Sequence, residues 1–292
     1  MPTVLITGTT GLVGSYLTES LRKKNGWDIC GVSRSRGACV DQTVDLADRK
    51  SVIPLKNLGD FDVVVHTAAM TKTDLCENNK PGCHMANVVA TKNLAETFPA
   101  AKFVFFSTYA VYNTPKGNCT EDTPVLPTNH YIATKIEAEG IVRAMSDMVI
   151  VRPSVIFGYT TFSRETKNYF MHLLENVRNK KITQSPTDQF FNPIHVNSVG
   201  RLIRGLIEKD SHGIYNIGCN ENTSKFEFNR CVMERFGFDM ALLQGIESRN
   251  LQIVRPNNGT VSSQKIQKDL GCPIPPLTTM IDDLYGSTQG AL

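Results

Sequence analysis

Tyr131 and Lys135 have the residue types and the spacing of an acid–base pair. They are four residues apart in Tyr-Ile-Ala-Thr-Lys, inside a segment of helical spacing, so both side chains share one helix face. A lysine ammonium close to a phenol favours the phenolate, and the phenol then exchanges a proton readily near neutral pH. The pair predicts a centre for proton transfer, against the alternative of a chance pair on an amphipathic helix.

A glycine-rich loop lies between the first apolar run and the helical pattern that follows it. Gly8, Gly11 and Gly14 recur in Thr-Gly-Thr-Thr-Gly-Leu-Val-Gly. Gly8 permits a tight turn, Gly11 lets the backbone approach a pyrophosphate, and Gly14 lets the helix pack closely on the strand. The strand–loop–helix context predicts a dinucleotide site that also includes Thr10 and Leu12, against the alternative of a turn without a ligand.

The second apolar run ends in a basic sequence, Ser33-Arg34-Ser35-Arg36. At this place NAD enzymes usually carry an acidic residue that binds the ribose 2′-hydroxyl. Arginine suits a 2′-phosphate instead. We therefore expect Ser33, Arg34 and Arg36 to bind NADP(H), with NAD(H) as the second option. The alternative is that both arginines are solvated loop residues.

Alternating strand and helix patterns must position these groups. In the first half of the chain, apolar runs typical of buried strands alternate with segments whose apolar residues recur at helical spacing. The expected strands are residues 4–7, 29–33, 43–46, 62–69, 102–107 and 148–152, and the expected helices are residues 12–24, 79–98 and 130–145. Repeated βα units predict a doubly wound α/β fold of the Rossmann type, in which helices cover both faces of a parallel sheet.

After Ser154 the pattern loosens into loops rich in proline, glycine and asparagine. The expected helices there are residues 166–178, 197–208, 225–236 and 280–285, with a strand at 214–217. We expect a dinucleotide-binding domain of residues 1–154, to which residues 197–218 return. Residues 155–196 and 219–292 then form a smaller substrate-binding lobe at the carboxyl edge of the sheet, where ligands of open α/β folds bind.

Composition limits the class of protein. The chain has 292 residues, of which 41% are hydrophobic, and a formal net charge of +3, too small to indicate binding to nucleic acid or a membrane surface. No apolar run reaches the ~18 residues of a membrane span, and the N-terminus lacks the flanks of a signal peptide. The eight cysteines form no Cys-x-x-Cys pair, and Cys76, Cys83 and His84 match no common zinc spacing. We expect a soluble cytoplasmic protein without a metal site.

These motifs together resemble the extended branch of the short-chain dehydrogenase/reductase superfamily, which modifies nucleotide sugars. The Gly-x-x-Gly-x-x-Gly spacing and the Tyr-x-x-x-Lys pair carry the resemblance. It implies that Thr108, in Phe-Ser-Thr-Tyr-Ala-Val-Tyr, hydrogen-bonds the substrate carbonyl. It also implies a homodimer through helices 79–98 and 130–145. The further residues that it places beside the cofactor are Asp45 and Leu46 at the adenine, and Thr67, Ala68 and Ala69 below the central riboses.

Within this branch the chain is most similar to the dTDP-4-dehydrorhamnose reductases. Dehydratases carry Asp-Glu after the catalytic Thr, where this chain has Tyr109 and Ala110, and epimerases carry an Asn that is missing from Arg-Pro-Ser-Val-Ile-Phe-Gly. The reductase segments Arg-Thr-Ser-Trp-Val and Asp-Gln-x-Gly-x-Pro-Thr resemble residues 152–157 and 188–194. Val155 stands in place of the family's substrate-stacking Trp, so the identity of the sugar and of the nucleotide stays open.

The resemblance implies an oxidoreductase that uses NADPH to reduce a 4-keto group on a nucleotide-linked 6-deoxy sugar. Tyr131 then donates the proton, Lys135 tunes the phenol and holds the nicotinamide ribose, and Thr108 polarises the carbonyl. The residues expected to contact the nucleotide sugar are Thr71, Thr108, Val155, Gln189 and Arg255. Two alternatives stay open: an epimerase with tightly bound NAD, and a non-catalytic regulatory subunit similar to the β-subunit of methionine adenosyltransferase.

Overall fold

A seven-stranded parallel sheet forms the centre of the computed structural model, which describes residues 2–23, 26–160, 168–250 and 258–289. The strand order is β11-β6-β5-β4-β1-β2-β3, and every neighbouring pair is parallel. The strands are β1 (Thr3–Thr7), β2 (Asp28–Ser33), β3 (Gln42–Thr43), β4 (Val63–His66), β5 (Lys102–Phe106), β6 (Met148–Pro153) and β11 (Gly213–Ile217). This sheet confirms the doubly wound α/β fold expected from the alternating pattern.

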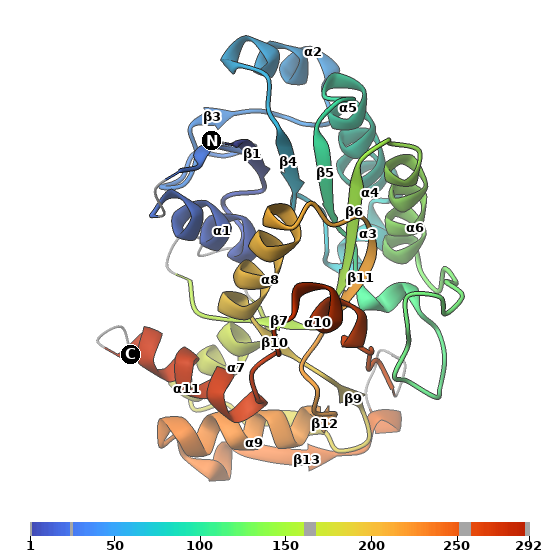
Figure 1. Ribbon diagram of the computed structural model, residues 1–292. Helices are drawn as coiled ribbons and strands as arrows, with labels where there is room; N and C mark the ends of the chain where they lie inside the picture. Colours follow the sequence, from blue (N-terminus) through green and yellow to red (C-terminus); the bar gives the residue numbers. More distant parts are fainter. Residues whose placement is uncertain (1, 24–25, 161–167, 251–257, 290–292) are drawn as a thin grey trace.

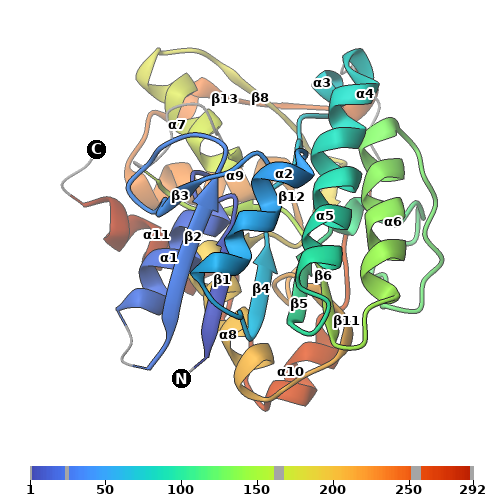
Figure 2. The ribbon, with the colours of Figure 1, turned by 90° about the horizontal axis from the view of Figure 1, so that it is seen from above.

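Helices cover both faces of the sheet, as Figures 1 and 2 show. One layer contains α2 (Arg49–Val52), η1 (Ile53–Leu58), α5 (Ala90–Thr97) and α6 (His130–Arg143), and the other contains α1 (Leu12–Arg22) and α8 (Val196–Glu208). Buried strand residues alternate between the layers: Val4 and Ile6 pack with α1 and α8, whereas Leu5 packs with the opposite layer. The cause is the two-residue period of a strand, whose successive side chains point to opposite faces.

The carboxyl ends of the parallel strands meet at one edge, where the chain reverses its direction across the sheet. From β1 the chain proceeds to β2 and β3, and it then returns to β4 on the other side of β1. Ligands of open α/β sheets bind in the crevice outside such a switch point. The loops after β1, β2, β4 and β5 carry the glycines, the arginines, residues 67–69 and Thr108, so the fold gathers the expected site at this edge.

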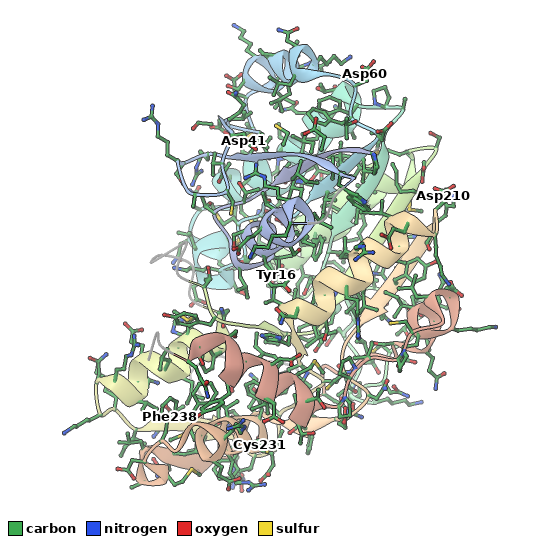
Figure 3. All side chains as sticks on the ribbon, turned by 60° about the vertical axis from the view of Figure 1, so that its left-hand side comes forward. Tyr16, Asp41, Asp60, Asp210, Cys231 and Phe238 are labelled. Atoms are coloured by element: carbon green, nitrogen blue, oxygen red, sulfur yellow. The ribbon has the colours of Figure 1, made fainter. Side chains whose placement is uncertain are left out.

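A smaller lobe of helices and short strands packs below the carboxyl edge in Figure 1. Its helices are α7 (Tyr169–Arg178), α9 (Lys225–Phe236) and α11 (Leu277–Thr288), while α10 (Gln264–Leu270) packs on α8 and β11. Two-stranded sheets join β7 (Ile156–Phe157) to β10 (Ile194–His195), β8 (Thr183–Pro186) to β13 (Leu243–Ile246), and β9 (Phe190–Phe191) to β12 (Thr223–Ser224). Figure 3 labels Cys231 and Phe238 in this lobe, and Asp41 and Asp60 on the opposite part of the molecule.

The helix expected at residues 79–98 is divided. It consists of α4 (Lys80–His84), the π-helical turn η2 (Met85–Val89) and α5. The helix expected at residues 130–145 is α6, and Asn129 caps it, because the Asn129 side chain accepts a hydrogen bond from the Ile132 N–H at 2.9 Å. The helix that carries Tyr131 and Lys135 therefore begins at a defined residue just before Tyr131.

The other differences from the expected elements are short. The third strand is Gln42–Thr43 rather than residues 43–46, and α7 begins at Tyr169, after residues 166–167 that lie outside the described part. The sequence analysis did not predict several short elements, because a few residues are too few to show a clear hydrophobic period. They include α3 (Thr73–Asn78), η3 (Tyr109–Val111), η4 (Met240–Leu242), η5 (Ser248–Asn250) and α10. Among the helices of the described ranges, none combines the length and the apolar character that crossing a membrane would need.

Candidate active site

The glycine loop has the backbone conformation that a dinucleotide site requires. Gly8 has a φ of 71°, and a Cβ atom added there would lie 2.8 Å from the backbone of Ala68. A Cβ atom at Gly14 would lie 2.4 Å from the Gly8 carbonyl oxygen, so neither position accepts a side chain. The loop places the start of α1, at Leu12, at the carboxyl edge, where a helix N-terminus can receive a pyrophosphate.

The basic loop after β2 lies beside the glycine loop. The hydroxyl oxygens of Thr10 and Ser33 are 2.8 Å apart, and a Cβ atom at Gly37 would lie 3.2 Å from the Thr10 methyl carbon. Arg34 and Arg36 are exposed. The structure therefore brings this loop to the predicted adenosine end of the site, and the assignment of its arginines to a 2′-phosphate stays a prediction.

The segment after β4 lies between the glycine loop and β5. The Thr67 hydroxyl donates to the Thr7 carbonyl oxygen at 2.6 Å, and the Ala68 N–H donates to the Thr7 hydroxyl at 3.3 Å. These bonds hold residues 67–69 against the end of β1, and their small side chains keep the backbone accessible there. The expected contact of these residues with the central riboses stays a prediction.

Asp45 and Leu46 follow β3 at the far edge of the sheet. Leu46 is buried, and its carbonyl oxygen accepts a hydrogen bond from the Asn93 side chain at 2.9 Å. Asp45 is exposed, and its carboxylate accepts from the Ala47 N–H at 3.0 Å. The pair is thus held in a defined turn, and its contact with an adenine stays a prediction.

Thr108, Tyr131 and Lys135 come together at the end of β5. Thr108 lies directly before η3, and its hydroxyl accepts a hydrogen bond from the Ala110 N–H at 3.2 Å. Tyr131 and Lys135 occupy the first turns of α6, which packs against β5. The Lys135 ammonium lies 4.0 Å from the centre of the Phe105 ring, and the Tyr131 phenol hydrogen-bonds the Thr108 hydroxyl. The three residues that the sequence predicted are adjacent, and their catalytic roles stay predictions.

The electrostatics of this centre correct one expectation. Burial raises the pKa of the Tyr131 phenol above its ordinary value of 10.0, and the hydrogen bond with Thr108 offsets only part of that rise. Burial also lowers the pKa of Lys135 to about 7, while the charge of Glu139 acts in the opposite direction. The expected shift of Tyr131 toward the phenolate is therefore wrong, and the phenol keeps its proton at neutral pH. The phenol is thus in the protonated form that a carbonyl reduction consumes, but its raised pKa makes it a weaker acid than an ordinary tyrosine.

A buried ion pair below this centre was missed by the sequence analysis. The Glu139 carboxylate accepts hydrogen bonds from Arg152 Nε at 2.9 Å and Nη2 at 2.6 Å, and from the Ser107 hydroxyl at 2.6 Å. Burial raises the pKa of Glu139, but the bonds and charge of Arg152 and the Ser107 bond outweigh it, so this pKa lies below its ordinary 4.5. A signal was present in the sequence, because Arg152 stands in an apolar strand and a buried charge needs a partner.

The described residues expected at the nucleotide sugar come from separate segments of the chain. Thr71 is exposed after β4, and Val155 is partly buried between β6 and β7. Gln189 is 2% exposed, and its side-chain oxygen accepts a hydrogen bond from the Lys225 ammonium at 2.6 Å, so it joins two parts of the lobe. Arg255 lies outside the described residues. Contact between these residues and a substrate stays a prediction.

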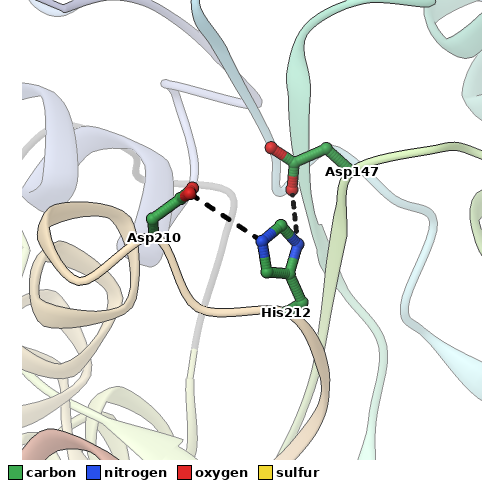
Figure 4. Close-up of side chains that lie close together, drawn as sticks. All are labelled: Asp147, Asp210 and His212. Atoms are coloured by element: carbon green, nitrogen blue, oxygen red, sulfur yellow. Dashed lines mark ion pairs between the residues drawn. The ribbon is translucent and has the colours of Figure 1, made fainter.

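A second group of ionisable side chains lies at the opposite, amino edge of the sheet (Figure 4). One ligand atom each from Asp147, Asp210 and His212 lies within 4.8 Å of the others, a spacing that could hold a metal ion. The Lys102 ammonium, however, contacts Asp147 at 2.6 Å and Asp210 at 2.9 Å. Because a lysine cation already neutralises these carboxylates, the group does not fit a metal ion.

Comparison with known sequences matches nearly the whole chain to one family. Residues 2–289 match the family model described as the RmlD substrate binding domain. The "Probable low-salt glycan biosynthesis reductase Agl14" of Haloferax volcanii is 25% identical over 288 residues, which cover 96% of this chain and 95% of that protein. The "Methionine adenosyltransferase 2 subunit beta" of Rattus norvegicus is 27% identical over 275 residues, which cover 90% of this chain and 81% of that protein. The relatives thus include a named reductase and a named subunit of another enzyme.

Comparison with solved structures gives the same fold. A dTDP-4-dehydrorhamnose reductase from Bacillus anthracis, solved in complex with NADP, superposes with a TM-score of 0.87. It is 21% identical, and the match covers 98% of this chain and 99% of that chain. The likeness confirms the sheet and the smaller lobe as one known architecture.

Proposed function

The chain belongs to the family of the RmlD substrate binding domain, and from this premise we propose that it is an NADPH-dependent reductase. Its substrate is the 4-keto group of a nucleotide-linked 6-deoxy sugar. The observation that carries the proposal is the convergence of Thr108, Tyr131 and Lys135 at the sheet edge that also holds the glycine loop. The reductase name of the Haloferax relative and the fold shared with the NADP-bound reductase of Bacillus anthracis support it.

The residues of the carboxyl edge fit NADPH. A Cβ atom at Gly8 or Gly14 would clash with neighbouring backbone, so these glycines permit the tight turn and the close packing of α1, while Gly11 would let the backbone approach a pyrophosphate at the start of α1. Arg34 and Arg36 would hold the 2′-phosphate, whereas residues 33–36 contain no carboxylate for the free 2′-hydroxyl of NAD(H). When bound, NADPH supplies the hydride for the carbonyl carbon.

Each residue of the centre has a separate task in this reduction. Tyr131 donates its phenolic proton to the carbonyl oxygen; because burial makes this phenol a weaker acid, the transfer depends on the positive charge of Lys135. Lys135 stabilises the phenolate that remains and hydrogen-bonds the nicotinamide ribose. The Thr108 oxygen already accepts from the Ala110 N–H, so its own hydrogen serves as the donor to the carbonyl oxygen.

The smaller lobe and its neighbouring loops would bind the nucleotide sugar. Residues 1–154 with 197–218 serve the cofactor in this proposal, and residues 155–196 with 219–292 serve the substrate. Thr71, Val155, Gln189 and Arg255 are the proposed contacts to the nucleotide sugar. Val155 offers an aliphatic surface, so we expect less discrimination between nucleotide bases than an aromatic platform would give.

The proposal is tested with a panel of nucleotide-linked 4-keto-6-deoxy sugars that differ in nucleotide and in sugar. The purified chain should oxidise NADPH in a one-to-one ratio with the appearance of a 4-hydroxy sugar nucleotide, detected by mass spectrometry. A chain that binds NADPH tightly and oxidises it with no member of the panel would contradict the proposal.

Two other functions are separable in the same preparation. An epimerase would retain its dinucleotide through purification and show no net NADPH consumption. A non-catalytic subunit would bind the cofactor, turn over no sugar and co-purify with a partner enzyme. The similarity to the methionine adenosyltransferase subunit beta is the observation that keeps this second candidate.

We also propose a homodimer through residues 79–98 and 130–145. A groove of about 860 Å³ lies between these helices, and its apolar lining includes Val89, Ile141 and Met145. Ile132 and Val142 of α6 are buried inside the protomer instead. Light scattering should give twice the protomer mass, and Ile141→Glu should give a monomer; a monomeric parent chain would contradict the proposal.

A further inference from the structure

Glu139 joins the two elements that carry the reactive side chains. It lies on α6 one turn after Lys135, and its carboxylate accepts a hydrogen bond at 2.6 Å from Ser107, the residue before Thr108. We infer that Glu139 is a positioning residue of this centre: it fixes the end of β5 against α6 and places a negative charge beside the Lys135 ammonium. This inference rests on the proposed reductase function and assigns the residue that organises its centre.

The hydrogen bonds of Glu139 leave it little freedom to move. Arg152 binds both carboxylate oxygens, Ser107 binds one of them, and Arg143 approaches the other at 3.3 Å from the exposed side of α6. Glu139 is 2% exposed, so water does not compete for these bonds. Several donors hold the carboxylate in one position. Because Ser107 is hydrogen-bonded to it, the position of the Ser107 backbone is fixed as well.

Arg152 extends the same network across the sheet. It is 1% exposed and donates to the Tyr112 hydroxyl at 2.7 Å, and that hydroxyl donates to the Asn216 side-chain oxygen at 2.9 Å. The network thereby connects β6, β11, α6 and the turn η3 that follows Thr108. A buried ion pair is often no more stabilising than well-packed apolar residues of the same volume. The hydrogen bonds of this ion pair are directional, and apolar contacts are not. The ion pair can therefore fix the position of the Thr108 loop relative to α6.

The charge of Glu139 also reaches Lys135. Among the described residues, the ionisable groups near the Lys135 ammonium include Tyr131 and Glu139 on its own helix, His66 on β4 and Cys83 on α4. His66 is neutral, because burial lowers its pKa to about 3. Burial lowers the pKa of Lys135, and Glu139 raises it again. Glu139 therefore keeps more of the lysine in its protonated form at neutral pH.

The first test is Glu139→Gln in the full chain with NADPH and the accepted sugar. Glutamine keeps the shape and an acceptor for Ser107 but removes the charge. We expect kcat at neutral pH to fall by about tenfold and the alkaline limb of its pH profile to move to lower pH by about one unit, because a tenfold change corresponds to one pKa unit. The dissociation constant for NADPH, measured at a pH below the alkaline limb, should change by less than about twofold, since cofactor phosphates bind elsewhere.

Matched variants separate positioning from stability. Ser107→Ala breaks the bond to Glu139 without unpairing a buried charge, and it should lower kcat while KM and the melting temperature stay near those of the parent. The double variant Glu139→Gln/Arg152→Gln has no unpaired charge, and it should regain stability while its alkaline limb stays displaced. Arg204→Gln, which removes an ion pair with Glu208 on α8 and touches no residue of this network, is the control that should leave the profile in place.

A direct titration makes the inference independent of the sugar. With lysines labelled at the ε-carbon, NMR should show a lower pKa for Lys135 in Glu139→Gln than in the parent chain, with the signal assigned through Lys135→Arg. An unchanged Lys135 titration together with a parent-like kcat in Ser107→Ala would overturn the inference. If the parent chain turns over no keto sugar, the proposed function fails, and the titration still decides whether Glu139 acts on Lys135.

Discussion

Each edge of the central sheet holds a buried cation, Arg152 with one carboxylate and Lys102 with two, and the two edges differ in what surrounds the cation. At the carboxyl edge, Arg152 and Glu139 are 1% and 2% exposed. At the amino edge, Lys102 is buried, but the side chains of its partners Asp147 and Asp210 are 31% and 76% exposed. Water and salt therefore screen the amino-edge group far more than the carboxyl-edge pair.

One strand connects the two arrangements. Lys102 begins β5, and Ser107, which contacts Glu139, follows its last residue. The cluster at the amino edge is open to solvent, whereas the pair at the carboxyl edge is buried and hydrogen-bonded to the residue before Thr108. The comparison teaches that a buried charge marks the functional edge when its partners are also buried and also belong to the reactive elements.

The largest expected difference between the edges concerns turnover. Tyr131→Phe removes the proposed proton donor, and we expect kcat to fall by about 10²–10⁴-fold, the range for general acid catalysis. Lys102→Met at the amino edge should leave kcat within about twofold, because it touches no reactive group. Steady-state kinetics with NADPH and the sugar measure both, and equal losses in the two variants would remove the distinction between the edges.

Stability should show the next largest difference. Arg152→Met leaves Glu139 charged and buried without its partner, and we expect a loss of about 3–5 kcal/mol in the free energy of unfolding. Lys102→Met leaves carboxylates that water can still solvate, so we expect a loss of about 1–2 kcal/mol. Urea unfolding monitored by circular dichroism compares them; a larger loss for Lys102→Met would reverse the comparison.

A moderate effect is expected on the preference for NADPH over NADH, and only from substitutions at the carboxyl edge. Arg34→Asp replaces a cation that suits the 2′-phosphate by a carboxylate that suits the free hydroxyl. We expect the ratio of kcat/KM for NADPH over NADH to fall by about 10–100-fold, as for the loss of one charged hydrogen bond. Lys72, which is also exposed but lies after β4, offers the control Lys72→Asp. An unchanged ratio in Arg34→Asp would remove the 2′-phosphate assignment.

The smallest expected effect is a change with pH in the difference between the free energies of unfolding of the parent chain and Arg152→Met. In the parent chain the pKa of Glu139 lies below 4.5, so its contribution is present above that pH and is lost as the pH falls through the lowered value. In Arg152→Met, burial then dominates and raises this pKa, and protonation relieves the unpaired charge. The stability deficit of the variant should therefore narrow from about pH 7 to about pH 4. A constant deficit would show that Glu139 is not its source.

The regular half of the molecule was predictable because its patterns are local. Buried runs such as Val63–His66 and the glycine loop follow from neighbouring residues alone, and the helix expected at residues 225–236 is α9 (Lys225–Phe236). The proximity of Thr108 to Tyr131 also followed, because the ends of parallel strands and their following helices share one edge.

What could not be predicted depends on contacts between distant residues. The partnership of Glu139 with Arg152, and of both with Tyr112, joins a helix, a strand and a turn, and no periodic pattern records it. The π-helical turn at Met85–Val89 and the two-residue strands of the smaller lobe have the same origin in tertiary packing. The phenol pKa was expected in the wrong direction, because burial was not visible from the spacing of Tyr131 and Lys135.

The central claim is that hydride passes from NADPH to a sugar carbonyl at this edge, with Tyr131 as proton donor. The most direct measurement uses NADPH with deuterium at both positions of its reactive ring carbon, together with the accepted 4-keto sugar nucleotide. Deuterium should appear at C4 of the product sugar in the parent chain and at a far lower rate in Tyr131→Phe. A product without deuterium at C4, or the same rate of labelling in Tyr131→Phe, would contradict the claim.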